Sequence, residues 1–303
     1  MTKLLFYLLG LLVLHFGAHV HVLPEPEVKV APPAEDNPDY YERSLQGGAP
    51  VVMYLHGISG SRALLGRVQV YQTLRNLGYH VIAVDYRYGD SSSGPLSEDG
   101  LVADSRCVYE WLRRRTADSP ILVWGHSLGS GVAVHLVSAL CRHGQPPAGL
   151  VLEAPFDNLA HEVSAHFLAT FHRDMPGFHW FFVAPLKVNG MAFESDVHIA
   201  GVTVPTLILH AEDDVIIPCR LGVQLHRSAL RYQPTHQVRL HTFEARFRYG
   251  HDFIWRSPRL PVLLSHRSLV RVPGVGPESS ETTLPPVNAN ELYTAFAGVM
   301  ATS

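Results

Sequence analysis

Apolar runs of strand length alternate with longer stretches of helix length through the central part of this chain. The short runs are rich in Val, Ile and Leu, as strands are when both faces of a parallel sheet are covered. They occupy residues 51–56, 80–86, 121–125, 149–154, 204–210 and 237–243. The helix-length stretches occupy residues 64–77, 101–115, 128–142 and 221–231. This alternation predicts an α/β domain whose sheet is mostly parallel, with right-handed crossovers and helices on both faces.

One connection departs from this alternation. Residues 155–196 lie between two predicted strands and are far longer than an ordinary connection in such a sheet. Their large aromatic residues are Phe156, Phe167, Phe171, Phe178, Trp180, Phe181, Phe182 and Phe193. We therefore expect a small cap inserted over the sheet, although a Phe-rich insertion is also what an ordinary core looks like.

The chain begins with a stretch that has no charged residue between positions 4 and 23. Twenty residues of helix rise about 30 Å, the thickness of a bilayer's hydrocarbon layer, so a membrane anchor is expected. A cleaved signal peptide, and hence secretion, is the alternative, but no Ala-x-Ala site follows the apolar residues. Because Lys3 precedes the stretch and Glu25 and Glu27 follow it, the domain is expected on the lumenal side of a secretory-pathway membrane.

Composition changes on either side of the organised part of the chain. Residues 24–50 are rich in Pro and acidic side chains and lack periodicity, so we expect a linker with at most a short strand at 28–30. The α/β domain is expected to span residues 51–268. Residues 269–303 contain many Gly, Pro and Ser positions and are expected to be a mostly disordered tail.

Charge and composition exclude several classes of protein. Lys and Arg total 24 against 27 Asp and Glu, and no polybasic block occurs, so nucleic acid is not an expected partner. The three cysteines are too few for a disulfide framework or a zinc site. The 19 histidines are scattered, and none belongs to a His-Glu-x-x-His pattern. No metal or organic cofactor is expected.

The pattern with the most chemical content is Gly-x-Ser-x-Gly, present as Gly125-His126-Ser127-Leu128-Gly129. It stands between a predicted buried strand and a predicted helix, which is the context of a nucleophile held above a sheet edge. Such a serine adopts a strained backbone conformation, and side chains at the two glycines would collide with the neighbouring strand and helix. Ser127 is therefore the predicted nucleophile, rather than a serine of an ordinary turn.

A turn with the sequence His56-Gly57-Ile58 follows the first predicted strand. In this class of sheet, that turn contributes one backbone N–H group to an oxyanion hole, and the residue after the nucleophile contributes the other. Ile58 and Leu128 are the predicted donors. The alternative is a glycine-rich turn that only connects a strand to a helix.

A serine hydroxyl needs a histidine to accept its proton and a carboxylate to orient that histidine. Asp213 and Asp214 follow the fifth predicted strand, at the sheet edge where ligand sites lie. We favour Asp214 as the acid because it precedes a short apolar step into a proline, which leaves Asp213 to cap or solvate the loop. His251 is the only histidine in the loop after the last strand and is the predicted base. His126 and His210 lie beside these motifs and could hydrogen-bond near the site.

Five separated blocks agree in order with a known family. They are residues 52–60 (VMYLHGISG), 78–90 (GYHVIAVDYRYGD), 124–131 (WGHSLGSG), 209–218 (LHAEDDVIIP) and 249–254 (YGHDFI). With these blocks the chain resembles the α/β-hydrolase-domain lysophospholipases, in particular the branch of membrane-anchored lysophosphatidylserine and monoacylglycerol lipases. The resemblance implies an α/β-hydrolase fold in which Ser127 is the nucleophile, Asp214 the acid and His251 the base.

The resemblance also implies a location and an activity. Members of that branch face the lumen of the endoplasmic reticulum behind one amino-terminal membrane helix. They carry two antiparallel edge strands before the first catalytic strand, for which this chain has only residues 24–50. The expected activity is hydrolysis of carboxylic esters of lipids, with lysophospholipids and monoacylglycerols as substrates. A peptidase or thioesterase on the same fold, or a membrane-tethered binding protein without catalytic activity, is the alternative.

Overall fold

The computed structural model describes residues 38–58, 61–87, 97–116, 118–165, 180 and 183–264. The chain divides into two compact units, Met1–Arg271 and Val272–Ser303, and every described residue belongs to the first. The predicted anchor at 4–23, the strand at 28–30 and the tail at 269–303 lie outside the described residues. Within the part that is described, no helix has both the length and the apolar character needed to cross a membrane.

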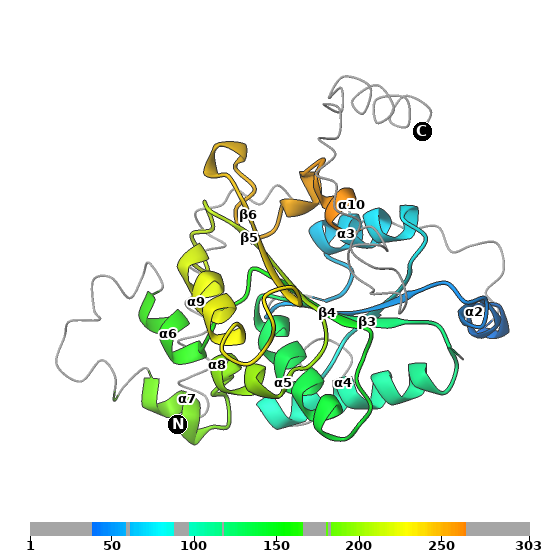
Figure 1. The fold of residues 1–303 in the computed structure, drawn as a ribbon, viewed down its shortest axis with the longest axis horizontal. Coiled ribbons are helices and arrows are strands. Elements are labelled where there is room, and N and C mark those ends of the chain that lie inside the picture. Colours follow the sequence, from blue (N-terminus) through cyan, green and yellow to red (C-terminus); the bar gives the residue numbers. More distant parts are fainter. Residues whose placement is uncertain are drawn as a thin grey trace. The chain divides into compact units, whose positions relative to one another are not determined.

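A six-stranded parallel sheet forms the centre of the first unit (Figure 1). In chain order its strands are β1 (Val51–Leu55), β2 (His80–Val84), β3 (Ile121–His126), β4 (Gly149–Glu153), β5 (Thr206–Ala211) and β6 (Val238–Phe243). Their spatial order is β2-β1-β3-β4-β5-β6, and each neighbouring pair is parallel. The predicted parallel α/β architecture is confirmed, and strand ends differ from the prediction by at most two residues.

Alternate residues of each strand enter different hydrophobic cores, because successive side chains of a strand point to opposite faces. In β1, Val51, Met53 and Leu55 join one core, and Val52 and Tyr54 join the other. Helices cover both faces (Figure 1). The core that contains Val51, called the first core, also includes residues of α4 (Glu98–Arg113), α5 (Leu128–Arg142) and α9 (Cys219–Ala229). The core that contains Val52, called the second core, includes residues of α3 (Leu65–Asn76) and α10 (Leu260–Leu263).

The helices near the site follow the predicted pattern, with differences at their ends. α5 has the predicted bounds 128–142. α4 begins three residues earlier than expected because Ser97 caps it, with the Ser97 Oγ accepting the Gly100 N–H at 3.2 Å. After His251 the described part of the chain forms two short elements, η5 (Ile254–Arg256) and α10. Ser257 between them is extended, as a residue before proline is expected to be.

The segment predicted as a linker contains a helix, α2 (Pro38–Leu45), so the expectation of at most a short strand in residues 24–50 was wrong at this point. A proline at the first position of a helix is favoured because its ring already holds the helical φ angle. Leu45, at the end of α2, is buried in the first core. Burial of this side chain attaches the helix to the core of the sheet. The linker-like composition of the segment does not reveal this contact.

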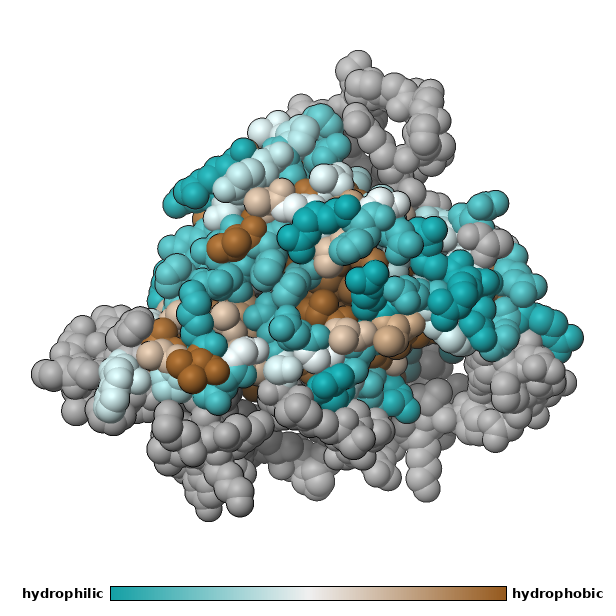
Figure 2. Space-filling model, turned by 90° about the horizontal axis from the view of Figure 1, so that it is seen from below, coloured by the Kyte–Doolittle hydropathy of each residue, from teal (hydrophilic) through white to brown (hydrophobic). Residues whose placement is uncertain are grey.

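The long connection between β4 and β5 contains several short helices and contributes two aromatic side chains to the core. Its described helices are α6 (Leu159–Ala165), α7 (Ala184–Val188) and α8 (Ser195–His198), followed by η3 (Ile199–Gly201). Phe156 and Phe193 are buried against α5, where both rings border Gly131. Trp180 is 70% exposed. Most of the coloured residues in Figure 2 are hydrophilic, and the hydrophobic ones form several smaller areas among them.

Candidate active site

Ser127 lies at a sharp turn between β3 and α5. Its backbone angles, φ 54° and ψ −122°, are unfavourable for a residue with a side chain. Its N–H donates to the carbonyl oxygen of Glu153, at the end of β4, over 3.0 Å. A Cβ atom at Gly125 would lie 2.3 Å from the carbonyl oxygen of Gly129, and one at Gly129 would lie 2.1 Å from that of Leu55. Both glycines of the motif are therefore required sterically, as the sequence predicted.

The turn after β1 lies directly beside this serine. A Cβ atom at Gly57 would come within 3.0 Å of the Ser127 Cβ and 3.5 Å of its Oγ. The Gly57 carbonyl oxygen accepts hydrogen bonds from His56 Nδ1 at 2.7 Å and from Arg67 Nη2 at 3.4 Å. On its other side the buried His56 ring lies with Nε2 3.2 Å from Asp85. The backbone of the turn is thus held in one orientation next to Ser127.

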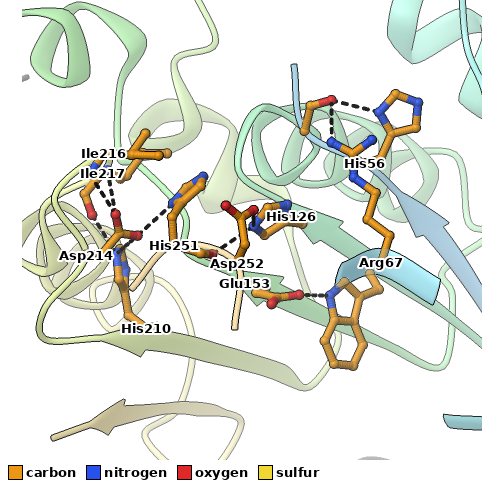
Figure 3. A network of polar contacts seen from close by, with 12 residues as sticks. His56, Arg67, His126, Glu153, His210, Asp214, Ile216, Ile217, His251 and Asp252 are labelled. Atoms are coloured by element: carbon orange, nitrogen blue, oxygen red, sulfur yellow. Dashed lines mark hydrogen bonds and ion pairs between the residues drawn. The ribbon is translucent and has the colours of Figure 1, made fainter. Parts of the chain in front are cut away.

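The Asp214 carboxylate is buried and bonded on both oxygens (Figure 3). Its Oδ1 accepts the backbone N–H groups of Ile216 and Ile217, each at 2.9 Å. Its Oδ2 lies 2.7 Å from His251 Nδ1 and 3.4 Å from His210 Nε2. Burial opposes the charge, but the neighbouring His251 and the hydrogen bonds from both histidines hold the pKa of Asp214 below its ordinary value.

Asp213, the competing candidate, contacts the backbone of the histidine loop instead of the imidazole. Its Oδ2 accepts the Gly250 N–H at 3.0 Å. Gly250 has φ 53°, a conformation that glycine adopts without steric cost. The two adjacent aspartates therefore have separate contacts. Asp214 orients the ring of His251, and Asp213 holds the residue before it.

His251 is buried beside the residue that precedes the serine. The Nε2–H of His126 donates to the His251 carbonyl oxygen at 3.1 Å, and the two ring centroids are 4.9 Å apart. Burial disfavours a charge on His251, but the charge of Asp214 and its hydrogen bond raise the pKa of the imidazole above its ordinary value. No hydrogen bond joins the described side chains of Ser127 and His251, so their pairing stays a prediction.

Two carboxyl groups near the site were not singled out from the sequence. Glu153 ends β4 and accepts the Trp124 Nε1–H at 2.9 Å, and its burial raises its pKa to about 7. Glu162 lies on α6, where burial also raises its pKa to about 7 and the charges of His251 and Asp214 act on it. An acidic residue at the carboxyl end of a buried strand was a readable signal for Glu153. Glu162 carried no comparable signal, because only the fold places α6 near the site.

Two groups of possible metal ligands occur among the described residues. In the first, Glu98, His135 and His198, the two imidazole rings are stacked at 13° with centroids 3.9 Å apart, so a single ion cannot lie in both ring planes. The second consists of His126, His251 and Asp252, and there the two histidines already hydrogen-bond to backbone and carboxylate oxygens. Both arrangements fit hydrogen bonding better than metal coordination.

The sequence of this chain is similar to those of known proteins. Residues 50–182 match a family model described as alpha/beta hydrolase fold. The chain is 43% identical over 230 residues to lysophosphatidylserine lipase ABHD12 of Danio rerio, covering 75% of this chain and 60% of that protein. It is 42% identical over 229 residues to the protein of that name in Xenopus tropicalis, covering 75% and 59%. The chain therefore spans about 60% of the length of these relatives.

A solved structure shows the same architecture. The crystal structure of an alpha-beta hydrolase from Vibrio vulnificus matches with a TM-score of 0.55 and 25% identity, over 68% of this chain and 69% of that one. The resemblance read from five blocks of the sequence is confirmed by these comparisons. Together with the parallel sheet and the strained turn at Ser127, they show that this chain carries an α/β-hydrolase domain.

Proposed function

We propose that this protein is a serine hydrolase that cleaves carboxylic esters of lipids, with lysophospholipids such as lysophosphatidylserine and monoacylglycerols as substrates. Ser127 is the nucleophile, His251 the base and Asp214 the acid. The observation that carries the proposal is the 2.7 Å contact between Asp214 Oδ2 and His251 Nδ1, with the ring of His251 beside the turn that presents Ser127. The names of the relatives supply the substrate class.

Each group has a defined part in the reaction. Asp214 accepts a hydrogen bond from the Nδ1–H of His251, and this keeps the proton of the neutral ring on Nδ1 and leaves Nε2 unprotonated. Nε2 then accepts the proton of Ser127 as the serine oxygen attacks the ester carbonyl. The imidazolium is stabilised by the Asp214 carboxylate and returns the proton to the leaving alcohol. In the second half of the reaction, His251 removes a proton from water as the water oxygen attacks the acyl-enzyme. The bond between the acyl carbon and Ser127 Oγ then breaks, His251 returns the proton to Oγ, and the fatty acid leaves.

The orientation of one peptide unit supports Ile58 as an oxyanion donor. The Gly57 carbonyl is directed toward His56 and Arg67 by the hydrogen bonds that it accepts. In a trans peptide the C=O of one residue and the N–H of the next point in opposite directions. The Ile58 N–H therefore faces away from His56 and Arg67. Leu128 is the first residue of α5, where backbone N–H groups lack partners within the helix, which supports it as the second donor.

Two other segments of the chain, the apolar amino-terminal stretch and the aromatic connection after β4, also suit a lipid substrate. We propose that the apolar stretch at 4–23 anchors the protein in the membrane of the endoplasmic reticulum, with the domain in the lumen. An anchored enzyme meets lipids at the membrane surface, so single-chain lipids are natural substrates. The aromatic connection at 155–196 is proposed to contribute a cap over the acyl chain.

The first experiment is labelling of the full-length chain with a fluorophosphonate probe, which reacts with activated serines. We expect labelling of the wild-type protein, complete loss in Ser127→Ala, and no change in Ser228→Ala, a control on α9. A folded wild-type protein that does not react would support a binding protein instead. Hydrolysis of lysophosphatidylserine, a monoacylglycerol, an acyl thioester and a blocked aminoacyl amide should then be compared. Faster cleavage of the thioester or amide would contradict the proposed lipid esterase.

A further inference from the structure

His126 occupies a position between the two halves of the proposed site. It is the last residue of β3, its side chain is almost completely buried, and Ser127 follows it directly. Its Nε2–H donates to the carbonyl oxygen of His251, 125 residues further along the chain, at 3.1 Å. Figure 3 shows the rings of His126 and His251 side by side, with Asp252 next to them.

We propose that His126 is a positioning residue that fixes the distance between the nucleophile and the base. Through its bond to the His251 backbone, it attaches the loop that carries the base to the strand that carries Ser127. This inference rests on the proposed function, because it assigns a role to His126 in the reaction of Ser127 and His251.

The other hydrogen bonds of this loop reach Ser127 less directly. In the described part of the chain, residues 250 and 251 make three hydrogen bonds to other elements. Two of them go to Asp213 and Asp214, which both belong to the loop after β5. Those two bonds fix His251 relative to the loop after β5, which is connected to Ser127 indirectly, through the pairing of β5 with β4 and of β4 with β3. Among the hydrogen bonds of His251 that the described residues make, the one from His126 is the bond that leads directly to β3 and hence to Ser127. The same His126 Nε2 also lies 3.7 Å from Oδ1 of the next residue, Asp252.

His126 donates this hydrogen bond as a neutral ring with its proton on Nε2. A carbonyl oxygen only accepts hydrogen bonds, so Nε2 carries the proton and Nδ1 is unprotonated in the neutral ring. Burial and the charge of His251 lower the pKa of His126; Arg67 acts in the same direction, while Asp252 and the bond to the His251 backbone oppose it. A neutral His126 avoids repelling the imidazolium that forms on His251 during the reaction.

The environment of Nδ1 agrees with this tautomer. The atom is buried and has no hydrogen-bond partner among the described residues. It lies 3.4 Å from the position that a Cβ atom would occupy at Gly57. A proton on Nδ1 would therefore be placed against the turn of Gly57 without an acceptor. The ring is fixed between that turn on one side and the His251 carbonyl on the other.

The test compares two side chains of nearly equal shape in the full-length protein. His126→Gln places an amide N–H near the position of Nε2, whereas His126→Met fills similar space without a donor. Misplacement of a reacting group by about 1 Å can cost about 10²-fold in rate. We expect His126→Met to slow fluorophosphonate labelling and kcat for a monoacylglycerol by about 10- to 100-fold, with KM within about 2-fold. His126→Gln should recover most of this loss.

The control is His226→Met on α9, a histidine that bonds to the backbone of Val238 away from the site. It should leave kcat unchanged. If His126→Met does not fold, His126→Asn, whose amide is too short to reach the His251 carbonyl, replaces it as the variant without a donor. Wild-type rates in a folded variant without a donor would overturn the proposal. Equal losses of rate in the variant without a donor and in His126→Gln would also overturn the proposal, because packing rather than the hydrogen bond would then be responsible. A folded wild-type protein that is unreactive would instead contradict the proposed function itself.

Discussion

The Asp214 carboxylate contacts Nδ1 of His251 at 2.7 Å, although 37 positions separate the two residues along the chain. The contact forms because β5 and β6 are neighbouring parallel strands, so the loops after them leave the same edge of the sheet. It decides between two adjacent aspartates that the sequence alone leaves in competition, and several expected outcomes depend on it.

Asp214→Asn should lower kcat far more than Asp213→Asn. The amide cannot hold the imidazole in the tautomer that accepts the serine proton, and loss of this function costs up to about 10⁴-fold in comparable triads. In Asp213→Asn the Gly250 N–H loses a charged acceptor, but the amide oxygen of the asparagine can accept the same hydrogen bond. We therefore expect kcat to fall by at most about tenfold. Steady-state kinetics of both variants, with folding checked by circular dichroism, makes the comparison. Equal losses would contradict the assignment of Asp214.

The rate of serine labelling should rise with pH, with a midpoint above the ordinary histidine pKa of about 6.5. The reaction needs neutral His251, and Asp214 raises the pKa of that imidazole against the opposing effect of burial. In Asp214→Asn the raising charge is gone, so the midpoint should move to lower pH. Labelling rates measured between pH 5 and 10 test both statements. A midpoint that does not move in the variant would show that another group controls the profile.

Gly129→Ala should destabilise the fold strongly, because its Cβ atom would lie 2.1 Å from the carbonyl oxygen of Leu55 in β1. Overpacking of this kind costs about 1–3 kcal/mol or more. Gly66→Ala in α3 is the matched control, since its Cβ would meet its nearest atom at an ordinary 3.4 Å. It should be neutral or stabilise the protein by up to about 1 kcal/mol. Urea unfolding of the two variants gives the comparison, and similar free energies of unfolding would refute the steric argument.

Glu98 should stabilise the attachment of the β4–β5 connection to α4 and α5. Its Oε1 lies 2.8 Å from His135 Nδ1, and its Oε2 accepts the Phe193 N–H at 2.6 Å. Burial opposes the charge, but bonds from His135, His198 and Phe193 lower the pKa of Glu98 to about 2. Glu98→Gln should therefore cost about 1–3 kcal/mol near neutral pH. Glu110→Gln, at a more exposed pair with Arg106, should change stability by less than about 0.5 kcal/mol.

The sign of the pH effect follows from the lowered pKa. A carboxyl group whose pKa is depressed in the folded state contributes stability above its unfolded pKa, and loses that contribution as pH falls through its folded pKa. The difference between wild type and Glu98→Gln should thus be full above about pH 5 and decrease towards pH 2. Urea unfolding at several acid pH values measures it. A difference independent of pH would mean that the carboxylate charge is not involved.

Much of the domain was predictable from local pattern. Strands buried on both faces leave continuous Val, Ile and Leu runs, and the helix at 128–142 was predicted with its observed bounds. The spacing of Gly125, Ser127 and Gly129 identified the strained turn, because the steric demands of that turn act over five consecutive residues. Elements that depend on distant contacts escaped prediction. α2 is an example, since Leu45 is buried in a core that the surrounding composition does not suggest.

Sequence by itself thus determined the sheet, its order of elements and the residue types available for chemistry, because hydrophobic period and turn sterics are local properties. Only the tertiary structure assigned separate contacts to Asp213 and Asp214, brought His126 to the backbone of His251, and placed Glu162 within electrostatic range of the site. These relationships join loops from different strands. They depend on where the edge of the sheet brings those loops together. The spacing of residues along the chain does not give the distance between the loops.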